Sequence, residues 1–182
     1  AEGVEDLQPQ AKLAGGGGRV EWAIAWPGDG GGAFLSSYCN TVPTPLGGSH
    51  EQGLRGALSK GLRAYGELAR NRRAAQITAD DVIAEACGLL SLFIGDPQFQ
   101  GQTKEKLSSP QAGKQVETTL KDHFEHWLAS DPGAANELLA HVLTRVDERL
   151  KRRQDKEVAR QSATRKLRLP GKLSDCTRSG SA

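Results

Sequence analysis

The chain has 182 residues, enough for one domain with a hydrophobic core and too few for two complete catalytic domains. Lys and Arg number 24 against 22 for Asp and Glu, so net charge indicates no particular partner. The longest apolar run, residues 87–94, is too short to cross a membrane, and no signal segment opens the chain. These features exclude an integral membrane protein and predict a soluble, cytoplasmic one.

The cysteines and the first residue carry two further expectations. Cys39, Cys87 and Cys176 are widely spaced and belong to no metal-ligand pattern, so reduced thiols are expected. The chain begins with Ala and contains no Met, which favours a piece of a longer protein.

The first part of the chain predicts a flexible segment followed by two strands. Residues 1–18 are rich in Gly, Gln and Ala, and we expect order to begin at Arg19. Residues 20–26 alternate between apolar and other side chains, which is typical of a half-buried strand. The Pro- and Gly-rich residues 27–32 favour a turn into a second strand at 33–40, so we predict a hairpin.

The pattern then changes to a helical period over residues 50–70. The apolar positions that recur at steps of three or four are Leu54, Leu58, Leu62, Tyr65 and Leu68. The basic residues of this helix, Arg55, Lys60 and Arg63, are expected to point mainly outward. Thr78 and Asp81 have capping-box spacing at the start of a short helix, and residues 89–94 are apolar enough for a buried strand.

The second half of the chain predicts a polar loop and two helices. Residues 100–106 form the loop, and Ser109-Pro110 is typical of an N-cap followed by proline at the first helical position. Asp131-Pro132 begins another helix in the same way. The expected buried positions of the two helices are Val116, Leu120, Phe124, Trp127, Leu138, Leu139, Val142, Val146 and Leu150. Beyond Leu150 the apolar stripe ends, so we expect a long solvent-exposed helix until Pro170-Gly171.

Positive charge gathers in this long helix and the residues after it. From Arg145 to Lys172, eleven Lys or Arg accompany four Asp or Glu. The candidate contacts to DNA phosphates are Arg145, Arg149, Arg152, Arg153, Lys156 and Arg160. No base-reading motif accompanies them, so any contact is expected to be sequence-independent and sensitive to salt. A solvated helix held by neighbouring acids such as Asp155 and Glu157 explains the same pattern, and both interpretations remain open.

Three stretches, in this order and spacing, resemble one protein family. They are SYCNTVPTPLGGSHEQG at 37–53, DPQFQGQTKEKL at 96–107 and LPGKLSDC at 169–176. Together they resemble the transducer domain of the B subunits of bacterial type II DNA topoisomerases, over residues 19–176. The amino-acid sequence of these stretches is closer to topoisomerase IV than to gyrase, although gyrase stays an alternative.

The resemblance implies an α+β fold with a left-handed βαβ crossover of the ribosomal-protein type, a sheet backed by helices and a long basic C-terminal helix. It implies that the first strand and helix of the family domain are missing. The expected segments are a lead-in at 1–18, the transducer core at 19–144, the basic helix extension at 145–168 and a linker toward an absent cleavage domain at 169–182.

The resemblance also assigns a role to the polar loop. In the family a Gln-Thr-Lys loop touches the γ-phosphate of ATP held by a neighbouring ATPase domain, and the matching residues here are Gln102 and Lys104. A Lys ammonium and a Gln amide suit phosphate oxygens. The expected cofactors are ATP and Mg in the full-length protein, and none for this piece alone, which holds no complete catalytic set.

The function implied is to relay the γ-phosphate state to DNA gate movement. The implied partners are duplex DNA, the A subunit of topoisomerase IV and a second B subunit. Besides the B subunit of gyrase, a freestanding, non-enzymatic nucleic-acid-binding module of the same fold remains an alternative.

Other conspicuous residues predict structural roles. His50 is expected to fix the turn into its helix. His123 and His126 have no evident third ligand, so no metal site is predicted. The glycine runs at 15–18 and 28–32 lack the Lys-Ser/Thr ending of a phosphate-binding loop. Cys39 is expected to be a small buried apolar residue.

Overall fold

The computed structural model describes residues 10–15, 17–28 and 32–166, with residues 10 and 162–166 described by their backbone alone. The chain divides into two compact units, residues 1–146 and residues 147–182. The linker expected at 169–182, with Cys176 and the third family-like stretch, lies outside the described residues, as does most of the lead-in.

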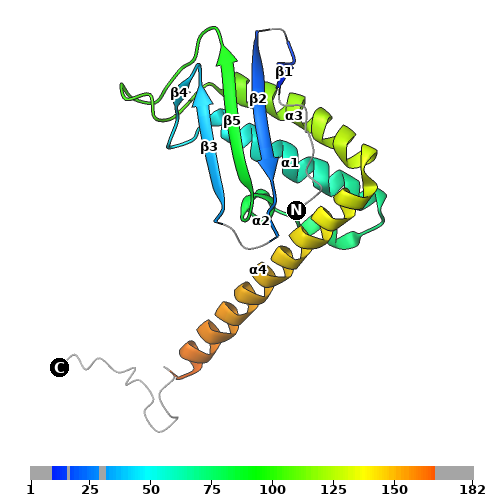
Figure 1. The fold of residues 1–182 in the computed structure, drawn as a ribbon. Helices are drawn as coiled ribbons and strands as arrows, with labels where there is room; N and C mark the ends of the chain where they lie inside the picture. The colour runs from blue at the N-terminus through cyan, green and yellow to red at the C-terminus, as the bar shows by residue number, and fades with distance from the viewer. Residues whose placement is uncertain (1–9, 16, 29–31, 167–182) are drawn as a thin grey trace, which may run out of the picture. The chain divides into compact units, whose positions relative to one another are not determined.

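Five strands of the first unit form one mixed sheet in the order β1-β2-β5-β3-β4 (Figure 1). They are β1 (Gln10–Lys12), β2 (Gly18–Ala25), β3 (Phe34–Cys39), β4 (Val42–Pro43) and β5 (Cys87–Ile94). The central strand β5 pairs antiparallel with β2 and parallel with β3. The expected sheet backed by helices is therefore confirmed.

Both predicted N-terminal strands exist, but the predicted hairpin between them is wrong. Trp22 of β2 and Ser37 of β3 both pair with Leu90 of β5, which separates the two strands. Leu90 and Leu92 are fully buried, so β5 supplies the apolar centre of the sheet. The turn-forming residues between β2 and β3 therefore join strands that are not neighbours, and local turn chemistry could not reveal this.

The prediction that order begins at Arg19 is also wrong. Residues Gln10 to Lys12 pair with Arg19 to Glu21 as the edge strand β1, and Leu13 is only 2% exposed. An edge strand is held by backbone hydrogen bonds and needs no apolar alternation of its own. The Gly-rich composition around it therefore concealed it.

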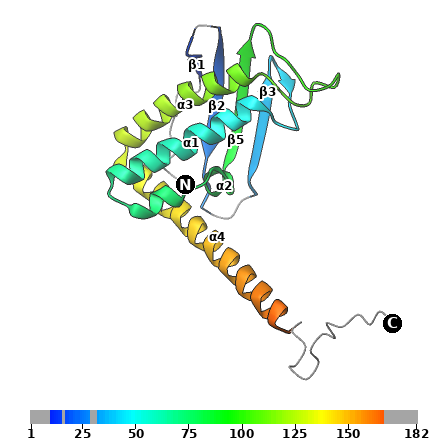
Figure 2. The same ribbon diagram turned by 180° about the vertical axis from the view of Figure 1, so that it is seen from behind.

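Two helices, α1 (Ser49–Leu68) and α3 (Pro110–Ser130), lie side by side on one face of the sheet (Figure 2). The predicted apolar stripe of α1 is confirmed over Leu54, Leu58 and Leu62, which are at most 1% exposed. Leu68 was expected to continue the stripe, but as the last residue of α1 it is 85% exposed.

A short 3-10 helix, η1 (Arg72–Gln76), and helix α2 (Ala79–Ile83) connect α1 to β5. The predicted capping box is confirmed: the Thr78 side chain accepts a hydrogen bond from the Asp81 amide, and the Asp81 carboxylate accepts one from the Thr78 amide at 2.8 Å. These bonds satisfy amides that a five-residue helix cannot satisfy internally.

Helix α4 (Pro132–Lys166) begins as predicted, because Asp131 Oδ1 accepts a hydrogen bond from the Ala134 amide at 3.0 Å. Its residues up to 146 belong to the first unit, where Val142 and Val146 are fully buried. They join the same core as Phe124 of α3, which is 1% exposed. Among the described residues, no helix has both the length and the apolarity that a bilayer crossing needs.

Candidate functional site

The loop between β5 and α3 carries the two predicted phosphate-contacting residues, and it reaches out beyond the β3–β4 edge of the sheet (Figures 1 and 2). Its two arms are hydrogen-bonded to each other. The Gln100 amide donates to the Lys106 carbonyl at 2.8 Å, and the Ser108 amide donates to the Gln98 carbonyl at 2.7 Å. The loop is therefore a narrow hairpin-like projection with a defined base.

That base is fixed to the start of α1 through Leu107. The Leu107 amide donates to the Gly47 carbonyl at 3.1 Å, and the Ser49 amide donates to the Leu107 carbonyl at 2.9 Å. Leu107 is 1% exposed, so the loop enters the core at this point. A second contact, from the Leu46 amide to the Glu105 carbonyl at 3.1 Å, extends the attachment toward the tip.

Glycine at 48 is required for this attachment. Gly48 has a φ of 146°, and a Cβ there would lie 2.3 Å from the Leu107 carbonyl oxygen and 2.6 Å from its nitrogen. Both obstacles are backbone atoms, which no side-chain rotation can remove. The Gly-Gly pair before α1 therefore lets the loop pass directly against the helix start.

The tip of the loop presents its side chains to solvent. Gln102, Thr103 and Lys104 are all exposed. Lys104 has a φ of 57°, a left-handed conformation that non-glycine residues adopt at some cost, and Gly101 before the tip has a φ of 82°. The Lys104 ammonium lies 6.0 Å from the centre of the Phe99 ring. The structure thus brings the two predicted residues together on one projection, where an ammonium and an amide can meet a phosphate group.

Three buried polar side chains, His50, Thr44 and Ser37, form a row of hydrogen bonds next to the start of α1. The His50 Nε2 lies 3.1 Å from Thr44 Oγ1, which lies 2.8 Å from Ser37 Oγ on β3. His50 is fully buried, and its Nδ1 has no hydrogen-bond partner among the residues that the structure describes. Burial lowers the pKa of His50 to about 4, because the charged imidazolium loses its hydration. His50 therefore fixes the turn into α1 as a neutral side chain, as expected.

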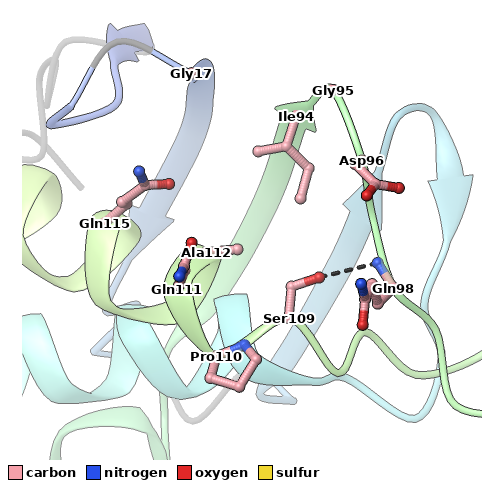
Figure 3. A pocket seen from close by; sticks show the side chains of 10 residues that line it. All are labelled: Gly17, Ile94, Gly95, Asp96, Gln98, Ser109, Pro110, Gln111, Ala112 and Gln115. Carbon is pink, nitrogen blue, oxygen red and sulfur yellow. Dashed lines mark hydrogen bonds between the residues drawn. The ribbon is translucent and has the colours of Figure 1, made fainter.

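A cavity of about 620 Å³ opens beside the loop base (Figure 3). Asp96 and Gln98 of the loop and Gln111 and Gln115 of α3 supply its polar lining. Ser109 stands at the N-cap position of α3, but its Oγ accepts a hydrogen bond from the Gln98 amide at 2.9 Å and makes no cap bond. The predicted N-cap position at Ser109 and the proline at the helix start are therefore confirmed, while the Ser109 hydroxyl binds the loop base.

The predicted DNA-contacting residues divide between the two units. Arg145, in the first unit, is half-buried, and its Nη1 lies 2.5 Å from Glu85 Oε1. In the second unit Arg149 is half-buried. The remaining four candidates are exposed: Arg152, Arg153, Lys156 and Arg160. Arg152 also lies 3.6 Å from Glu148, one helical turn away.

The histidines and cysteines contribute no metal-binding group among the described residues, where no three His, Cys, Asp or Glu side chains gather. His123 instead contacts the Trp22 ring, with centroids 5.3 Å apart. Cys39 is fully buried, as predicted, and burial raises the pKa of its thiol to about 11. Within the described ranges, the loop therefore presents no cluster of carboxylates of the kind that holds Mg²⁺.

A protein-family model described as DNA gyrase B matches residues 2–158. The chain belongs to the DNA gyrase B family. A relative within this family, the B subunit of DNA topoisomerase 4 from Caulobacter vibrioides, is 59% identical over 162 residues, which are 87% of this chain and 23% of that protein. The corresponding protein of Bartonella bacilliformis is 55% identical and covers 91% of this chain and 24% of that protein. The chain therefore spans about a quarter of the length of these gyrase B family relatives.

Solved structures of the family share this fold. The topoisomerase IV ATP-binding domain of Francisella tularensis superimposes with a TM-score of 0.68 at 30% identity, over 78% of this chain and 39% of that one. The 43K ATPase domain of Thermus thermophilus gyrase B gives a TM-score of 0.69 at 25% identity, over 82% of this chain and 41% of that one. The mixed sheet and its helices thus match the ATPase region of gyrase B family proteins.

Proposed function

We propose that this chain is the transducer segment of a topoisomerase IV B subunit, and that it relays the γ-phosphate state of ATP to the movement of DNA gates. The topoisomerase 4 relatives support the assignment to the B subunit. The connection between the parallel neighbours β3 and β5 supports the transducer fold. Viewed with α1 in front of the sheet, β5 lies to the left of β3 (Figure 2), as a left-handed crossover requires.

The observation that carries the proposal is the exposed pair Gln102 and Lys104 on a projection with a fixed base. Lys104 would supply a compact positive charge to a γ-phosphate oxygen, and Gln102 a hydrogen bond beside it. ATP with Mg²⁺, bound to another domain of the full-length protein, would supply the phosphate. After hydrolysis Lys104 would lose its electrostatic partner, and the first unit would be free to move with its loop.

The experiment is Lys104→Ala in the full-length protein, in complex with its partner. We expect ATP turnover to fall about 100-fold or more, as when a preorganised donor to a reacting group is removed, with an unchanged melting temperature. Lys114→Ala is the matched control, since Lys114 is an exposed lysine on α3 away from the tip, and turnover should be retained. Normal turnover in the Lys104→Ala enzyme would overturn the proposal.

We further propose that α4 contacts duplex DNA through backbone phosphates. The exposure of Arg152, Arg153 and Lys156 supports this. Replacing these three residues by Gln should make the slope of log binding constant against log salt concentration shallower by roughly 3, about one for each lost phosphate contact. Lys121→Gln on α3 should leave the slope unchanged. An unchanged slope in the triple variant would favour the solvated-helix interpretation.

The partners we propose are the A subunit of topoisomerase IV and a second B subunit. The B subunit of gyrase is the alternative, because the family model and the Thermus thermophilus structure fit a gyrase subunit as well. The assembled enzyme distinguishes the two, since DNA supercoiling would indicate gyrase and preferential decatenation would indicate topoisomerase IV. A freestanding nucleic-acid-binding module would give neither ATP-dependent activity.

A further inference from the structure

The central strand β5 links two features at its opposite ends. Its last residue, Ile94, leads directly into the loop that carries Gln102 and Lys104. Two residues before its first residue, Cys87, stands Glu85. The strand lies at the centre of the sheet and pairs along its whole length with β2, and over six residues with β3.

Glu85 binds α4 through both of its carboxylate oxygens. Glu85 Oε2 lies 2.9 Å from His141 Nε2, and Glu85 Oε1 lies 2.5 Å from Arg145 Nη1. His141 and Arg145 are four residues apart, so they lie on the same side of the helix on successive turns. We call these three residues the Glu85 clamp. Their side chains are 27% to 34% exposed, so solvent screens the contacts only in part.

The position of the clamp defines what it can control. Both α4 residues precede position 146, where the first unit ends. The two polar contacts, on successive turns, oppose rotation of α4 about its own axis. The apolar contacts of Val142 and Val146 bury that side of the helix but constrain its rotation less strictly. Hydrogen bonds and ion pairs are directional, whereas apolar burial is not.

We propose that Glu85 is a positioning residue that couples the loop to α4. Displacement of the loop would move β5 along with its neighbours, and Glu85 would pass this movement to His141 and Arg145. The inference rests on the proposed function, because it presumes that the loop follows a nucleotide and that α4 acts on DNA. Glu85 touches neither, so its loss should separate ATP turnover from DNA transport.

The test is Glu85→Gln in the full-length protein, in complex with its partner. The substitution keeps the shape of the side chain but removes its charge and one acceptor oxygen. We expect ATP turnover close to the unaltered rate, while the number of DNA molecules decatenated for each ATP hydrolysed falls roughly 2- to 30-fold. If the variant and the unaltered enzyme decatenate the same number of DNA molecules for each ATP hydrolysed, the proposal is overturned.

A matched control is Glu125→Gln on α3. Glu125 forms a similarly exposed pair with Lys121, at 3.4 Å, within one helix. This control should change neither ATP turnover nor the number of DNA molecules decatenated for each ATP hydrolysed. A loss of coupling in Glu125→Gln equal to that in Glu85→Gln would overturn the proposal, and so would a parallel loss of ATP turnover and decatenation in Glu85→Gln.

A charge exchange adds a readout that a purely structural role would not give. Glu85→Lys alone places two cations together and should uncouple more strongly than Glu85→Gln. Combining it with Arg145→Glu restores an ion pair of reversed direction and should recover at least part of the coupling. No recovery would count against the clamp. Failure of the proposed function itself would appear separately, as retained ATP turnover in Lys104→Ala.

Discussion

Acidification should destabilise this chain through His50, because the folded state holds that imidazole neutral. The folded pKa of about 4 lies below the ordinary value of 6.5. As the pH falls below 6.5, the unfolded chain therefore binds a proton at His50 and the folded chain does not. The free energy of unfolding decreases until the pH reaches about 4. Burial removes the hydration that a charged imidazolium needs, and no described residue offers the Nδ1 a partner for a second N–H bond, so the folded state resists protonation.

The magnitude follows from the two pKa values. Each pH unit between them is equivalent to about 1.4 kcal/mol, so the full effect is about 3 to 4 kcal/mol, of which about 2 kcal/mol appears between pH 7 and pH 5. This is a large part of the stability of an ordinary domain, which is about 5 to 15 kcal/mol. Stability is then retained near neutral pH and lost on the acid side.

Urea unfolding of the chain at several pH values measures the effect. His50→Gln should be less stable at pH 7, because it replaces a fitted ring, but its unfolding free energy should depend less on pH by about 2 kcal/mol between pH 7 and pH 5. His126→Gln removes an exposed histidine and is the matched control. Parallel curves for His50→Gln and the unaltered chain would refute the reasoning.

Two further predictions concern close packing. Gly48→Ala should lower the unfolding free energy by about 3 kcal/mol or more, because its Cβ would meet Leu107 backbone atoms. Gly28→Ala should change it by less than about 0.5 kcal/mol, because no atom of the described residues lies within 4 Å of the added Cβ. Phe124→Ala should cost about 3 to 5 kcal/mol by leaving a cavity, and Leu68→Ala, at an 85% exposed position, less than about 0.5 kcal/mol. Denaturant midpoints check both pairs, and equal effects within either pair would contradict the packing described.

Sequence periodicity predicted the elements better than their arrangement. The stripe of Leu54, Leu58 and Leu62 predicted α1, and Thr78 predicted the start of α2, since both signals lie within a few residues. The order of strands depends on contacts between distant residues. Nothing near β2 or β3 indicates that β5 lies between them, so the sequence favoured the local hairpin.

The residues of the candidate site were harder to predict from the sequence than the helices and strands. Gln102 and Lys104 are ordinary loop residues, and only the family resemblance singled them out. The role of Gly48 depends on Leu107, far along the chain, so no local pattern indicates it. The Glu85 clamp gave one weak signal, the four-residue spacing of His141 and Arg145, but their common partner became evident only in the folded chain.

A structure of the full-length protein with a non-hydrolysable ATP analogue tests the central claim most directly. We predict that Lys104 Nζ lies about 2.7 to 2.9 Å from a γ-phosphate oxygen, with the Gln102 amide on the same phosphate. A bound analogue whose γ-phosphate is surrounded by other residues, with the tip of the loop turned away into solvent, would contradict the account.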